Sequence, residues 1–172
     1  MKLRRLDLRH TARRVRRKLR RTAAVRYRSI VVPLLGREET RHAVDLACLL
    51  AADRRARLIL VAPLVVDPEL PLDAHFDAET AELRAEMGEA ASIADSYGVG
   101  TRRRLVRTRD RALGLKLAEV AHDHRAELIV VGAPVESRRG FRQAFPPDVM
   151  SVLRDAPCRV MVATGPAAAG GV

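Results

Sequence analysis

Aromatic residues, cysteines and long apolar runs are scarce in this 172-residue sequence. Aromatic side chains make up 3% of the chain and tryptophan is absent, so we expect a core of aliphatic side chains. No apolar run approaches the roughly 18 residues that span a bilayer, and there is no signal-peptide h-region. With 48% hydrophobic residues, the chain is long enough for one domain with extensions.

The sequence has only two cysteines, Cys48 and Cys158, which lie in a predicted helix and a predicted strand. Two cysteines this far apart form neither a zinc-binding pattern nor a disulfide framework. We expect two buried, reduced thiols, as in a cytoplasmic protein.

The positive charge is concentrated at the N-terminus. Residues 1–28 hold 13 of the 32 Lys and Arg residues and one of the 21 Asp and Glu residues, which gives a charge of +12. The remaining residues hold 19 basic and 20 acidic side chains, which gives −1 and accounts for the total of +11. A basic arm is therefore attached to a nearly neutral domain.

The arm, residues 1–26, is rich in arginine from Arg4 to Arg21. Its apolar residues follow helical spacing, so we expect a basic amphipathic or disordered segment that binds an anionic membrane surface or nucleic acid. A juxtamembrane linker, an organellar transit peptide and a solvated tail stay open as alternatives. The arm has no aromatic residues for base stacking, which disfavours nucleic acid. Its narrow apolar stripe consists of Leu8, Ala12, Val15 and Leu19.

Apolar runs and amphipathic stretches alternate along residues 27–164. Runs rich in β-branched residues predict buried strands, and apolar residues three and four positions apart predict helices. This alternation predicts an α/β domain, with a parallel sheet and helices on both faces. Residues 165–172 predict a disordered tail. The predicted strands are 29–35, 58–62, 99–106, 128–131 and 158–163, and the predicted helices are about 40–53, 76–97, 110–124 and 146–155.

Four local predictions accompany these elements. Residues 63–71 contain three prolines and predict a loop, and Asp110 is predicted to cap the helix that follows it. Arginines 102–104 within a strand indicate a sheet edge. His122 and His124 at the end of a helix predict a basic C-terminal cap.

The order of these segments resembles the universal stress protein family over about residues 26–163. The resemblance implies a Rossmann-like fold of the adenine nucleotide alpha hydrolase-like kind, with a five-stranded parallel sheet of order 3-2-1-4-5. Family members often dimerise through the final strand, which here is Arg159–Ala163. The segments that carry the resemblance are residues 28–33, the helix 43–50, residues 127–132, and residues 152–162 with the Ala-Pro-Cys sequence.

The family's ATP-binding motif is incomplete in this chain. Members that bind ATP carry an acidic residue just after the first strand, where this sequence has Leu35. They carry Gly-x2-Gly after the fourth strand, and here Gly132 is present but the second glycine is Val135. They open the last helix with Gly-Ser or Gly-Thr. In this chain the corresponding pair is Phe145-Pro146 when counted forward from Gly132, or Pro146-Pro147 when counted back from the Ala-Pro-Cys sequence. Neither pair supplies a glycine or a hydroxyl group.

These departures matter physically. Glycines let backbone N–H groups approach phosphate oxygens, and proline has no N–H to donate. We therefore predict no bound cofactor. The alternative is a site for ATP or another nucleotide that uses Gly132 with the loop residues Arg138, Arg139, Gly140 and Arg142.

No motif predicts catalysis. The sequence has no Walker A loop, no Gly-x-Gly-x-x-Gly and no zinc-binding His-x-x-x-His helix. The acidic loop around Asp67, Glu69 and Asp73 is predicted to be solvated, with no metal. The absence of these motifs predicts a non-catalytic domain, and the family resemblance implies a cytoplasmic stress-response module that dimerises and mediates interaction. Because similar domains occur fused behind membrane transporters, the arm also indicates a transporter partner and membrane association.

Overall fold

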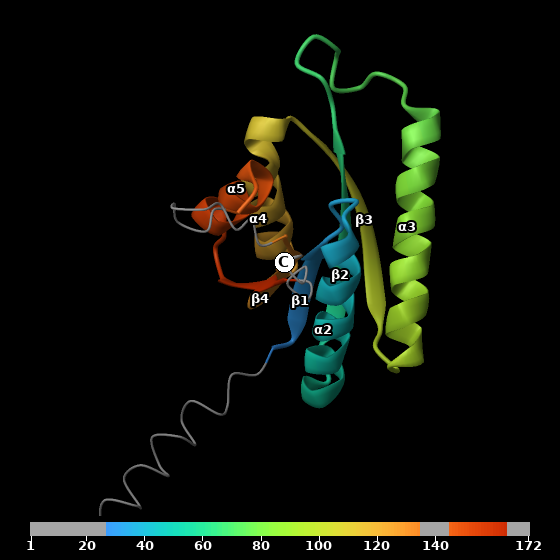
Figure 1. Ribbon diagram of the computed structural model, residues 1–172, viewed down its shortest axis with the longest axis vertical. Helices are drawn as coiled ribbons and strands as arrows, with labels where there is room; N and C mark the ends of the chain where they lie inside the picture. The colour runs from blue at the N-terminus through green and yellow to red at the C-terminus, as the bar shows by residue number, and fades with distance from the viewer. Residues whose placement is uncertain (1–26, 135–144, 165–172) are drawn as a thin grey trace, which may run out of the picture.

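The computed structural model describes residues 27–134 and 145–164, which form a five-stranded α/β domain (Figure 1). The arm, the loop 135–144 and the tail, and with them the predictions made for these segments, lie outside the described residues. The elements in order are β1 (Ser29–Pro33), α2 (Glu38–Arg54), β2 (Arg57–Val65), α3 (Asp77–Ser96), β3 (Thr101–Thr108), a 3-10 turn (Asp110–Ala112), α4 (Leu113–Asp123), β4 (Leu128–Gly132), α5 (Pro147–Asp155) and β5 (Arg159–Ala163).

All strand pairs are parallel, and the sheet order is β3-β2-β1-β4-β5. This confirms the order that the family resemblance implied. Central strand β1 pairs with β2 on one side and β4 on the other, so Ile30 lies opposite both Leu58 and Leu128. The strand order reverses between β1 and β4, and ligands of open α/β sheets bind at such a switch point.

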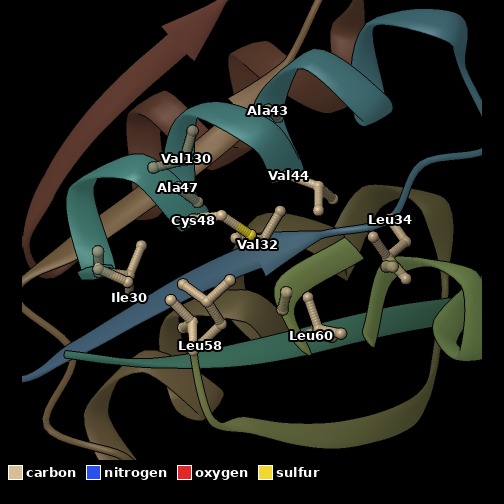
Figure 2. Close-up of a cluster of buried hydrophobic side chains, with 14 of the residues drawn as sticks. Ile30, Val32, Leu34, Ala43, Val44, Ala47, Cys48, Leu58, Leu60 and Val130 are labelled. Atoms are coloured by element: carbon tan, nitrogen blue, oxygen red, sulfur yellow. The ribbon is translucent and has the colours of Figure 1, made fainter. Parts of the chain in front are cut away.

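One face of the sheet is covered by α2 and α3. Alternate residues of the central strands point to this face, since side chains of a strand alternate between its two sides. Figure 2 shows Ile30 and Val32 of β1 meeting Ala47 and Cys48 of α2. Small residues on the helices let α2 and α3 approach the sheet closely, which is how a core with so few aromatic residues fills its volume.

The opposite face is covered by α4 and α5. Val31, Ile59 and Ile129 on this face pack with Leu113 and Leu117 of α4. β1 is therefore buried on both faces, as its continuous apolar sequence predicted.

Strand β2 is longer than predicted, because residues 63–65 continue the strand rather than beginning a loop. Pro63 is tolerated because of where its missing N–H would point. The N–H of Leu34 donates to the carbonyl of Val61, so odd-numbered residues of β2 face β1, and β1 has already ended where Pro63 lies. Pro63 therefore interrupts no hydrogen bond of the sheet.

One prediction about a helix end is wrong and another is confirmed in part. Asp110 lies in the 3-10 turn and makes no side-chain cap to α4, whose first residue is Leu113. His122 lies in the last turn of α4 as predicted, whereas His124 follows that turn, and its Nε2 accepts a hydrogen bond from Nε of Arg104 at 3.2 Å. Burial and the neighbouring charges of Arg104, Arg102 and Arg57 lower the pKa of His124, although Asp123 opposes them.

Both cysteines are free thiols, but only Cys48 is fully buried, while Cys158 is half-buried. Burial raises the pKa of Cys48 to about 11, and Asp45 adds to the shift. Within residues 27–134 and 145–164, no helix combines the length and the apolar character needed to cross a bilayer.

Candidate functional site

The candidate site is the carboxyl edge of the sheet at the switch point between β1 and β4. After β1 the chain turns at Gly36, whose φ of 65° lies in the left-handed region, and enters α2. Thr40 fixes this turn, because its Oγ1 accepts a hydrogen bond from the N–H of Arg37 at 3.3 Å. Glu39 and Thr40, in the first turn of α2, lie directly beside Gly132 at the end of β4. A phosphate group would have to approach this position.

Gly132 is the one predicted binding residue that lies within the described part of the chain, and it is buried. It ends β4, and a Cβ atom built on it would overlap the backbone of Glu39 and Thr40 in α2. The space that a glycine provides here is occupied by the helix. Close packing of β4 against α2 is sufficient to explain a glycine at this position.

An ion pair crosses the switch point. Nη2 of Arg37, at the start of α2, donates to Oδ2 of Asp148, in the first turn of α5. The two side chains are 26% and 16% exposed, so the pair is largely shielded from water. It joins the start of α2 to the first turn of α5, which are 111 residues apart in sequence.

The start of α5 offers few N–H donors to an anion. Pro146 occupies the N-cap position and Pro147 is the first helical residue, and neither has a backbone N–H. The N–H of Val149 is engaged by Oδ1 of Asp148 at 2.9 Å. The helix N-terminus that would hold phosphate in an ATP-binding relative is therefore poorly equipped to do so here.

Leu35 stands where ATP-binding relatives carry an acidic residue. Its half-buried side chain packs against two apolar clusters on the α4 and α5 face. An apolar side chain in this orientation stabilises the loop and offers no hydrogen bond to an adenosine.

The other predicted binding residues, Arg138, Arg139, Gly140 and Arg142, lie outside the described residues. The pair Arg37 and Asp148 was missed by the sequence analysis, because nothing in a sequence links an arginine after one strand to an aspartate 111 residues later. Nη1 of Arg37 is buried and has no hydrogen-bond partner among the described residues.

The loop between β2 and α3 is fastened to the same edge by two arginines from the end of β3. Arg107 donates to the carbonyls of Leu72 and Ala74 at 3.0 and 2.8 Å. Arg109 donates to the carbonyls of Val66, Asp67 and Leu70. Asp67, Glu69 and Asp73 of this loop are exposed, as predicted.

A hollow of about 440 Å³ lies between α2 and α3, and Arg37 of the candidate site is among its lining residues. Its floor is apolar, with Arg41 on the α2 wall and Glu86 on the α3 wall. Burial raises the pKa of Glu86 and Glu89 adds to this, while the backbone of Gly36 opposes it. In the described part of the chain, no three His, Cys, Asp or Glu side chains are grouped closely enough to hold a metal ion.

The sequence matches the model of the universal stress protein family over residues 26–164. The chain belongs to this family. The match spans every strand and helix described above, so the family's fold and the observed sheet are the same unit. No protein of curated function matches the sequence.

Solved universal stress proteins superpose on most of the chain. One from Burkholderia pseudomallei is 28% identical, with a TM-score of 0.62 over 81% of this chain and 97% of that chain. Another, in complex with cAMP, is 25% identical, with a TM-score of 0.61 over 80% of this chain and 97% of that chain. The protein from Archaeoglobus fulgidus in complex with dAMP is 19% identical over 80% of this chain and 98% of that chain, with a TM-score of 0.61, and supports the fold alone.

Proposed function

We propose that this universal stress protein is a non-catalytic, dimerising interaction domain of the cytoplasm that works without bound ATP. The observation that carries the proposal is the ion pair between Arg37 and Asp148, which occupies the switch point. The packing of Gly132 against α2 and the prolines at the start of α5 support the same conclusion. A nucleotide in the usual position would have to break the ion pair and would find few backbone donors.

The dimer would form through β5. This strand lies at the edge of the sheet, and its residues Val160, Met161 and Val162 are half-exposed. On α5, the helix just before it, the large apolar side chains of Met150 and Leu153 are 49% and 37% exposed. An open strand edge next to exposed apolar side chains favours pairing with a second copy.

A calorimetric titration with Mg-ATP tests the absence of nucleotide binding. The full chain is used at about 0.15 M salt, where exposed charges are screened beyond roughly 8 Å. Inorganic tripolyphosphate serves as the matched control, because it carries the charge of ATP without adenosine. We expect no difference between the two, since only the basic segments would attract either of them.

The competing function is a nucleotide sensor, and the structure in complex with cAMP gives it a specific basis. In that case ATP or cAMP would bind saturably and at least tenfold more tightly than tripolyphosphate. The triple variant Arg138→Gln, Arg139→Gln and Arg142→Gln would abolish that preference. Such a result would overturn the ATP-free proposal and assign the site to this loop.

A further inference from the structure

Arginine side chains collect at the amino edge of the sheet, opposite the candidate site. In the parallel register Arg102 lies beside Ile59 and Arg104 beside Val61. Ile59 and Val61 face α4, and Arg57 lies two residues before Ile59, so all three arginines share the α4 side. Arg125 follows α4 at the same edge.

These four arginines are exposed, and none of them forms an ion pair with a described carboxylate. Of the four, only Arg104 has a hydrogen bond to a described side chain, and that partner is Nε2 of His124. The carboxylates that flank Arg125 in sequence are Asp123 and Glu127, and Glu127 already accepts hydrogen bonds from the N–H groups of Arg28 and Ser29 at 2.9 and 3.2 Å. The edge therefore carries a net positive field.

We propose that the α4 side of the sheet's amino edge, formed by Arg57, Arg102, Arg104 and Arg125, is a docking surface for anionic phospholipid membranes. The chain enters the domain at this same edge, since Tyr27 and Arg28 precede β1 (Figure 1). Docking here requires neither nucleotide binding nor pairing through β5.

Lipid fits this surface better than nucleic acid does. Base-specific readers of DNA rely on asparagine and glutamine as well as arginine, and the whole sequence contains no asparagine and only Gln143. Within the described ranges, these arginines lie on strands and in the turn after α4 rather than on a helix that could enter a groove. A broad charged edge suits a plane of headgroups, to which each basic residue near the surface contributes roughly a fivefold gain in binding.

The test measures binding of the full chain to phosphatidylcholine vesicles with about 30% phosphatidylserine at about 0.15 M salt. The variant Arg57→Gln, Arg102→Gln and Arg125→Gln is compared with Arg41→Gln, Arg84→Gln and Arg111→Gln, which removes equal charge from exposed positions elsewhere. We expect the first variant to bind about 10- to 100-fold more weakly than wild type, and the second to bind within about twofold.

Equal losses in the two variants, no loss in the first, or no vesicle binding by wild type would each overturn the assignment. The assignment would also be overturned if the first variant lost more affinity for random-sequence duplex DNA than for vesicles, because this edge would then be a nucleic-acid surface. Thermal unfolding of each variant checks its fold. If the triple variant does not fold, the single variant Arg102→Gln should still bind roughly fivefold more weakly than wild type.

Discussion

At the scale of single residues, Gly132 connects the fold to the candidate site. We predict that Gly132→Ala lowers the free energy of unfolding by about 1–3 kcal/mol or more, because the added methyl group overlaps the backbone of α2, which cannot move alone. Gly88→Ala is the control. It lies within α3 with nothing close to an added Cβ, and alanine there should be neutral or stabilising by about 0.5–1 kcal/mol.

Denaturant unfolding of both variants measures the effect. If Gly132→Ala were as stable as wild type, the close approach of β4 and α2 described here would be wrong. The sequence alone identified Gly132 as a candidate binding residue. It could not show whether a glycine is needed there for phosphate binding or for packing, because both requirements are met by the same residue type. Only the position of Glu39, 93 residues earlier in the chain, distinguishes the two reasons.

At the scale of elements, the five strands and four helices were recovered mainly from their apolar patterns, because most of them bury one face or both; the edge strand β3, with three exposed arginines, is the exception. The ends were less predictable. Proline is normally excluded from the interior of a strand, yet Pro63 lies within β2, because the neighbouring strand β1 has already ended at that level. Asp110 is a good capping residue by type, but it lies within a 3-10 turn, three residues before α4 begins. Both outcomes depend on neighbours that a local pattern does not contain.

The loop between β2 and α3 provides a prediction at this scale. Arg109→Gln should increase chymotryptic cleavage after Leu72 by about tenfold, because it removes charged donors from three carbonyls of the loop. Arg111→Gln, an exposed neighbour in the 3-10 turn, is the control and should leave the cleavage rate unchanged. Equal rates in wild type and Arg109→Gln would mean that the arginine does not hold the loop.

At the scale of the whole molecule, the proposed dimer can be tested through its backbone. The N–H of Ala133 donates to the carbonyl of Ala163, so odd-numbered residues of β5 face β4 and Val162 faces outward. Val162→Pro removes a backbone N–H that points away from β4, toward a partner strand paired with β5. We therefore expect the variant to be a monomer in sedimentation analysis.

The matched control is Arg103→Pro, at the opposite edge of the sheet. The N–H of Val66 donates to the carbonyl of Thr108, so even-numbered residues of β3 face β2 and Arg103 faces outward. This variant should remain a dimer. Monomeric wild-type protein, or dissociation of both variants alike, would exclude pairing through β5.

The contrast between the two edges of the sheet limits how large an assembly can become. β3 ends the sheet with three consecutive exposed arginines, and a second β3 aligned against it would bring like charges together. Two copies joined at β5 would leave only such arginine-bearing edges at both ends of the continuous sheet. Assembly would therefore stop at two subunits. Pairing through β5 would give a closed dimer and would not start a filament.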